Sequence, residues 1–212
     1  MKMFLDSAKT DEIRYALDLW DIDGITTNPK HVKDSGKPFR TVIEEIAGLF
    51  AGTTKEVSVE VDPNLADWEK MVDQGLELSK ISPNFVIKVG VSEQGFKAIR
   101  ELTNRGVRVN ATLIFSVAQA WQAARAGAAF VSPFVGWKEQ FGDPVESLIP
   151  EVAVMLENYD YRAEIIAAAI RNSRHIAEAA LAGAHCITAG MAVYQDSFRN
   201  MVEFVMDPAS YH

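Results

Sequence analysis

Short apolar segments alternate with longer amphipathic segments along the chain, and this alternation restricts the possible folds more than any other feature. The short segments are rich in β-branched residues. Several are apolar at successive positions, as strands buried on both faces of a parallel sheet are. The predicted strands are residues 3–5, 24–27, 56–61, 85–89, 107–115, 130–135, 165–170 and 185–189.

The longer segments carry apolar residues at helical spacing, as Ile13, Ala16 and Trp20 illustrate. Gly106, Gly127 and Gly183 each follow such a segment, where glycine commonly ends a helix. The predicted helices are residues 11–20, 41–51, 64–78, 92–105, 117–126, 144–158, 173–182 and 192–205.

Regular alternation of strand and helix implies a parallel sheet with right-handed crossovers. Eight such units in 212 residues predict a single (β/α)8 TIM barrel, an α/β fold, as one domain over residues 1–212. An open, doubly wound sheet is the alternative. It is weakened because the chain has no glycine-rich dinucleotide fingerprint.

The net charge of −8 argues against broad binding to nucleic acid or to anionic membranes, which requires a basic surface. Cys186 is the single cysteine, so no intrachain disulfide is possible, as suits a reducing cytosol. We expect a cytoplasmic protein, because the chain shows neither a signal-peptide pattern nor 18 successive apolar residues.

Polar residues recur where the predicted strands end. In a barrel such positions converge on one pocket at the carboxyl ends of the strands. A buried polar residue costs several kcal/mol unless it is paired, so a repeated pattern indicates function. The residues concerned are Asp6, Thr26, Thr27, Asn28, Glu60, Lys88, Asn110, Thr112, Ser132 and Arg171.

Lys88 interrupts the apolar run of residues 85–91. Burial would lower the pKa of its amine, and a free amine attacks a ketone to form a Schiff base. The alternative is a structural lysine paired with Glu60 or Asp6. These two carboxylates are in turn candidate acid/base groups, or simply its ion-pair partners.

The histidines share no metal-ligand spacing with cysteines or carboxylates, so we expect no metal and no other cofactor. This disfavours a metal-dependent (class II) aldolase. A further alternative is a sugar-binding barrel that has lost catalysis, which the set Asp6, Asn28, Glu60, Lys88 and Thr112 argues against.

Several motifs resemble the transaldolase family, specifically the small branch that includes the fructose-6-phosphate aldolases. The resemblance runs from Lys2 to about Asp207. The most specific motifs are TTNP at residues 26–29 and SPFVG at residues 132–136. The other motifs are FLD (4–6), VEV (59–61), VIKV (86–89) and VNATLIFS (109–116).

The resemblance implies a barrel in which Lys88 forms the Schiff base and Asp6 moves protons at the substrate hydroxyls. It further implies that Glu60 and Thr112 hold the catalytic water. The implied substrate-binding residues are Thr26, Asn28, Asn110, Ser132, Phe134, Trp137, Arg171 and Asn172.

Two positions distinguish transfer from simple cleavage. Transaldolases carry glutamate at the position of Glu60 and phenylalanine at that of Phe134, where fructose-6-phosphate aldolases have glutamine and tyrosine. Both residues here resemble the transferase. A lyase that releases free dihydroxyacetone is the alternative.

The chain departs from the family where the substrate phosphate is held. Trp137 replaces an arginine, and the Ser-Phe-Arg motif reads Ala169, Ile170, Arg171, so only Arg171 remains, with Lys138 and Asn172 beside it. A fixed charge that suits a phosphate dianion is lost. A sulfonate has a single negative charge and needs fewer positive charges to bind it.

Three donors therefore stay open. One is 6-deoxy-6-sulfofructose, since sulfosugar transaldolases occur in the family. The second is fructose 6-phosphate held by Arg171 and Lys138, and the third is an uncharged sugar. Acceptors would be aldose phosphates such as glyceraldehyde 3-phosphate. By resemblance alone, we expect a homo-oligomer, a pentamer or a decamer.

Overall fold

The computed structural model describes residues 1–140 and 147–199, and its strands close into a parallel barrel in chain order, with β8 paired to β1. This confirms the predicted TIM barrel and excludes the open sheet. The assignment of residues 1–212 to one domain stays a prediction. The strands are β1 (Lys2–Asp6), β2 (Gly24–Thr26), β3 (Glu56–Glu60), β4 (Phe85–Gly90), β5 (Val109–Ile114), β6 (Phe130–Pro133), β7 (Glu164–Ile170) and β8 (Cys186–Ala189).

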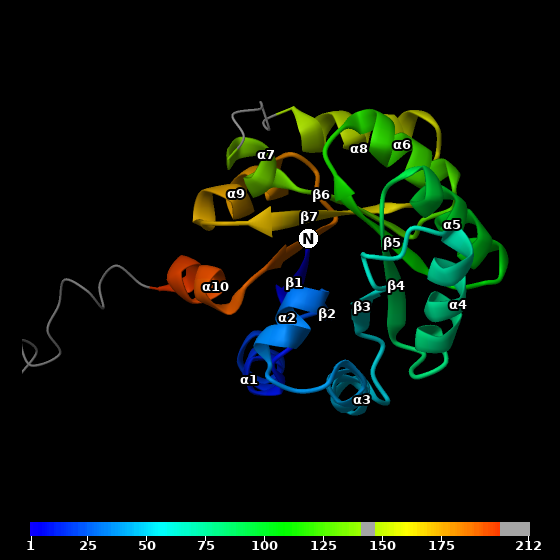
Figure 1. Ribbon diagram of the computed structural model, residues 1–212. Coiled ribbons are helices and arrows are strands. Elements are labelled where there is room, and N and C mark those ends of the chain that lie inside the picture. Colours follow the sequence, from blue (N-terminus) through cyan, green and yellow to red (C-terminus); the bar gives the residue numbers. More distant parts are fainter. Residues whose placement is uncertain (141–146, 200–212) are drawn as a thin grey trace, which may run out of the picture.

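The helices are α1 (Thr10–Trp20), α2 (Pro29–Asp34), α3 (Phe39–Phe50), α4 (Trp68–Ser79), α5 (Glu93–Asn104), α6 (Val117–Arg125), α7 (Val135–Gln140), α8 (Leu148–Asn158), α9 (Ser173–Leu181) and α10 (Met191–Phe198). They lie around the strands, with α4 beside α5 and α6 beside α8 (Figure 1). Within the described ranges, no helix has the length and apolar character needed to cross a bilayer.

Several boundaries differ from the prediction, and α7, like α2, lies where no helix was predicted. The predicted strand 130–135 was too long, because Val135 begins α7 and buries its side chain from there. Helix α4 begins at Trp68 rather than at residue 64, because Asp62 accepts hydrogen bonds from the backbone and side chain of Asn64 and makes a turn. Helix α2 was not predicted. Residues 144–146 and 200–205 of the predicted helices lie outside the described residues.

The three glycines expected at helix ends all have a left-handed backbone. The φ angles are +78° at Gly106, +92° at Gly127 and +85° at Gly183, which other residues adopt only with strain. This confirms the predicted ends of α5, α6 and α9.

The inside of the barrel is layered, because every second residue of a strand points inward. One layer is apolar and at most 1% exposed: Phe4, Val86, Phe130, Ile166 and Cys186. On four of these strands, the residue two positions further along also points inward and is polar. These residues are Asp6, Lys88, Ser132 and Thr188. The strand period thus places a polar layer directly above an apolar floor.

Candidate active site

A cavity of about 540 Å³ opens at the carboxyl ends of the strands. A barrel with this topology places its active site on this face. Of the residues singled out in the sequence as catalytic or substrate-binding, those that line it are Asp6, Thr26, Asn28, Lys88, Asn110, Thr112, Ser132, Phe134, Trp137 and Arg171. The predicted convergence of polar strand-end residues on one pocket is therefore confirmed for all of these except Phe134 and Trp137, which were not part of that prediction.

Lys88 is buried in the cavity wall beside Glu60, its register partner on β3. The Lys88 Nζ lies 3.2 Å from Oε2 of Glu60 and donates a 3.1 Å hydrogen bond to the carbonyl oxygen of Thr27. The ion pair between Lys88 and Glu60, which was the alternative, purely structural explanation for Lys88, is thus present. The pair does not exclude chemistry, since a carboxylate at this distance can accept a proton from the amine.

Asp6 has a partner on each carboxylate oxygen. The hydroxyl of Thr26 donates a 2.8 Å hydrogen bond to Oδ1, and Nε2 of His31 lies 3.1 Å from Oδ2. Burial acts to raise the pKa of Asp6, but the hydrogen bond from His31 and the charge of Lys88 act against it, and the pKa is lowered. Asp6 is therefore a carboxylate at neutral pH.

Asn110 and Ser132 form a buried polar chain across β3, β5 and β6. The Ser132 hydroxyl donates a 2.7 Å hydrogen bond to Oδ1 of Asn110, whose amide donates a 3.0 Å hydrogen bond to Oγ of Ser58. Thr112, two residues after Asn110, differs. Among the described residues, its Oγ1 is a buried side-chain oxygen without a hydrogen-bond partner. Such a group at a cavity is suited to hold water or a substrate hydroxyl.

Trp137 and Arg171 form the other end of the cavity. Trp137 is 41% exposed and packs edge-on against Phe134, with ring centroids 5.9 Å apart. The stem of Arg171 passes close to Gly136, where an added Cβ would lie 2.7 Å from the Arg171 Cγ. The side chain of Lys138, a candidate anion ligand, lies outside what the structure describes.

The comparison with known families agrees with this geometry. A family model for transaldolase/fructose-6-phosphate aldolase matches residues 3–204. The chain belongs to this family. The expectation of an enzyme, drawn from the motifs, is thereby confirmed at the level of the family.

Several curated relatives match most of this transaldolase-family chain. A 6-deoxy-6-sulfo-D-fructose transaldolase of Priestia aryabhattai is 50% identical over 201 residues, 94% of this chain and 89% of that protein. A probable transaldolase 2 of Listeria monocytogenes is 44% identical over 188 residues, 89% of this chain and 84% of that protein. A probable transaldolase of Clostridium botulinum is 42% identical over the same shares.

Asn172 is placed differently from the other predicted substrate-binding residues of this family member. Its Oδ1 accepts a 2.9 Å hydrogen bond from the backbone of His175 and caps the start of α9. It does not appear among the residues that line the cavity. The prediction that Asn172 contacts substrate therefore has no support from the described geometry. The described geometry instead gives Asn172 the role of a helix cap.

His31 is one of the site residues that the sequence analysis missed. It lies on α2, lines the cavity and contacts Asp6. A signal for this helix was available, since Asn28 followed by Pro29 is a typical helix start. Lys30 and Thr188, also missed, line the same cavity.

His175 lies on α9, and its side chain is buried. Its Nδ1 accepts a hydrogen bond from the backbone of Arg171, and its Nε2 lies 2.9 Å from Glu139. Over the ranges described, no group of three or more His, Cys, Asp and Glu side chains could hold a metal ion.

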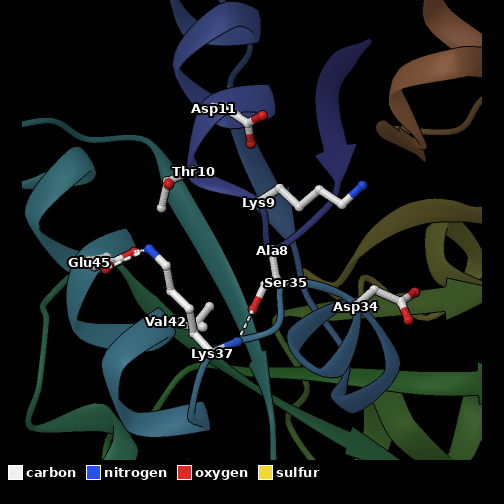
Figure 2. Close-up of a pocket in the computed structure, with 9 residues that line it drawn as sticks. All are labelled: Ala8, Lys9, Thr10, Asp11, Asp34, Ser35, Lys37, Val42 and Glu45. Atoms are coloured by element: carbon white, nitrogen blue, oxygen red, sulfur yellow. Dashed lines mark hydrogen bonds and ion pairs between the residues drawn. The ribbon is translucent and has the colours of Figure 1, made fainter.

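A second hollow of about 390 Å³ lies on the surface between the start of α1, the end of α2 and helix α3 (Figure 2). Lys37 reaches across it to Glu45, at 2.6 and 2.8 Å, and its backbone N–H donates to Oγ of Ser35. The predicted catalytic residues do not line this hollow. We therefore assign the candidate active site to the barrel cavity.

Proposed function

We propose that this protein is a class I transaldolase in which Lys88 forms a Schiff base with a ketose. The enzyme would pass the dihydroxyacetone unit to an aldose phosphate, such as glyceraldehyde 3-phosphate or erythrose 4-phosphate. The observation that carries this proposal is the buried Lys88 of β4, beside Glu60 and in one cavity with Asp6. The 50% identity to a named transaldolase supports the same reaction.

In the first step, the amine of Lys88 adds to the C2 carbonyl of the ketose and water leaves, giving an iminium ion. Glu60, at 3.2 Å from the amine, is placed to take and return the protons of this exchange. Asp6 then removes the proton of the C4 hydroxyl. The C3–C4 bond breaks, its electrons move to the iminium nitrogen, and an aldehyde leaves.

The second half reverses these events with a different aldehyde. The enamine carbon attacks the acceptor carbonyl, and Asp6 returns its proton to the oxygen that becomes the new hydroxyl. Water then hydrolyses the iminium ion and frees Lys88. The hydroxyl of Thr112, which has no hydrogen-bond partner in the described part of the chain, and the carboxylate of Glu60 are suited to hold that water.

Phe134 favours transfer over release in this scheme. It lines the cavity with an apolar ring and so offers no hydroxyl to protonate the enamine. An enamine that is protonated slowly persists until an acceptor arrives. Release of free dihydroxyacetone should therefore be the slower fate.

For the donor, we propose 6-deoxy-6-sulfofructose. Trp137 offers one indole N–H and Arg171 one guanidinium at the same end of the cavity, which suits a singly charged sulfonate. The name of the Priestia aryabhattai relative supports this donor. The cytoplasmic location and homo-oligomeric state stay predictions.

The donor is tested by comparing kcat/KM for 6-deoxy-6-sulfofructose and fructose 6-phosphate with erythrose 4-phosphate as the acceptor, because both donors then yield the same seven-carbon ketose phosphate. We expect a preference for the sulfosugar of about tenfold or more, roughly 1.4 kcal/mol. Trp137→Arg should move the preference toward fructose 6-phosphate by about 10-fold or more, because a charged hydrogen bond contributes roughly 1.5–3 kcal/mol.

Trp121→Arg is the matched control for this change. Trp121 on α6 is 39% exposed, close to the 41% of Trp137, but does not line the cavity. It should leave the donor preference unchanged. A tenfold preference of the unaltered protein for fructose 6-phosphate would instead establish a phosphate donor, and equal rates with fructose would establish an uncharged one.

Gly136→Ala should weaken binding of an anionic donor. The added Cβ would lie 2.2 Å from the carbonyl oxygen of Ala169 and 2.7 Å from the Arg171 Cγ, so α7 and the arginine must move apart. We expect the donor KM to rise by about tenfold, as for the loss of one charged contact. Gly48→Ala on α3 is the control, since its Cβ meets nothing within 4 Å. An unaltered KM would show that Arg171 does not hold the anion.

A further inference from the structure

The Asp6 carboxylate is held between two side chains from different elements. Thr26 of β2 donates to Oδ1 at 2.8 Å, and Nε2 of His31 lies 3.1 Å from Oδ2. The hydroxyl of Thr26 is itself 2.7 Å from that of Thr188 on β8. Because the Thr26 proton goes to Asp6, Thr188 must donate to Thr26. One oxygen of the Asp6 carboxylate thus ends a chain of hydrogen bonds from Thr188 through Thr26. The other oxygen contacts the imidazole of His31.

The position of the imidazole is set by the start of α2. Asn28 caps this helix by accepting a 2.9 Å hydrogen bond from the His31 backbone N–H, and Pro29 occupies the first helical position. Asn28 also lines the cavity. A single helix start therefore fixes both a predicted substrate-binding amide and the partner of Asp6.

We propose that His31 is a positioning residue of this active site, which fixes the orientation of the Asp6 carboxylate for proton transfer to and from the substrate. The proposal rests on the function proposed above, in which Asp6 moves the proton of the C4 hydroxyl. Each carboxylate oxygen has two acceptor sites, so Oδ2 can bind His31 and still face the cavity. Without this contact the carboxyl group could rotate about its terminal torsion, which is broad.

The charges around Asp6 indicate how removal of His31 would act. The charge of Lys88 on β4 acts on Asp6, and Lys88 is paired with Glu60 of β3. Lys30 of α2 pairs with Asp34. Arg171 lines the same cavity. From α10, the hydroxyl of Tyr194 donates to the carbonyl of Phe4. Burial, and after it the charge of Asp6, raise the pKa of that phenol, so it stays neutral.

Of the influences that lower the pKa of Asp6, the hydrogen bond from His31 is the largest, although burial opposes it. The side chain of Asp6 is 28% exposed and lines the cavity. Loss of His31 should therefore raise the pKa of Asp6. The carboxylate would be protonated at higher pH, and the acid limb of kcat/KM would move upward.

Two substitutions separate the hydrogen bond from the rest of the imidazole. His31→Met removes the donor and keeps an unbranched side chain that can fill the space, whereas His31→Gln supplies an amide N–H that can reach Asp6. We expect His31→Met to lower kcat by about tenfold or more and to shift the acid limb upward. His31→Gln should restore most of kcat. His185→Asn is the control, since His185 accepts a hydrogen bond from Ile165 at the opposite mouth of the barrel.

The carboxyl carbon of Asp6 should be titrated by ¹³C NMR in each variant, with Asp6→Asn identifying the resonance. Its pKa should rise in His31→Met and stay near the wild-type value in His31→Gln. In the Asp6→Asn background, His31→Met should cause no further loss of kcat. A further tenfold loss in that background, or a wild-type titration and pH profile in His31→Met, would overturn the proposal.

The two proposals fail in different ways. If the unaltered protein transfers no dihydroxyacetone unit, the proposed function is wrong and the role of His31 in turnover falls with it. If transfer occurs and His31→Met leaves kcat, the acid limb and the Asp6 titration unchanged, only the role of His31 is wrong.

Discussion

Replacing Lys88 with methionine should reduce dihydroxyacetone transfer by more than about 10⁴-fold, because without the amine no Schiff base can take up the electrons of the breaking C3–C4 bond. Borohydride reduction in the presence of a ketose provides the direct measurement. Intact mass should show a covalent adduct on the unaltered protein and none on Lys88→Met. Peptide mapping should place the adduct at Lys88.

The folding of this variant needs its own check. Lys88→Met leaves the Glu60 carboxylate buried at 8% exposure without its partner, which can cost roughly 3–5 kcal/mol. The double variant Lys88→Met, Glu60→Gln removes the unpaired charge and should be folded and equally inactive. Lys97→Met, which removes a lysine stacked on Trp68 of α4, is the control for loss of a lysine. Retained transfer in the folded double variant would assign the chemistry to another nucleophile.

Asp6→Asn should lower kcat by about 10²- to 10⁴-fold, the usual contribution of general acid–base catalysis. The amide oxygen can still accept the hydrogen bond from Thr26, so the local packing is kept while the proton acceptor is lost. The expected signature is a slow cleavage step, measured as the release of aldehyde in a single turnover.

Asp23→Asn is the matched control for Asp6→Asn. Asp23 accepts a 2.7 Å hydrogen bond from the backbone of Met3, at the opposite end of β1, and its amide counterpart can accept the same bond. Transfer should be unaffected. If Asp6→Asn kept kcat within threefold of the unaltered protein, the C4 proton would have to go to another group.

The barrel and most of its site could be predicted because they depend on short-range patterns. Strands buried on both faces give continuous apolar runs, so a polar residue such as Lys88 is conspicuous within one. The closing of the barrel then brings Lys88 of β4 and Asp6 of β1 to one cavity, although they are far apart in the sequence. Nothing beyond the number and direction of the strands was needed.

The parts that were not predicted depend on tertiary contacts of short elements. Helix α2 has six residues, too few to show an apolar period, so His31 was not placed at the site. Asn172 follows a strand end, as several cavity residues do, and only the geometry shows that its oxygen caps α9. The pairing of Lys88 with Glu60 was one of two open choices, and strand register decided it.

The apolar layer beneath the polar one has a consequence for the order of events in catalysis. With Phe4, Val86, Phe130, Ile166 and Cys186 at most 1% exposed, nothing passes through the axis of the barrel. Every molecule must use one entrance, and the outgoing aldehyde occupies the place that the incoming aldehyde needs. For the transfer proposed above, we therefore expect ping-pong kinetics, in which the first aldehyde departs while the three-carbon unit stays bound to the enzyme.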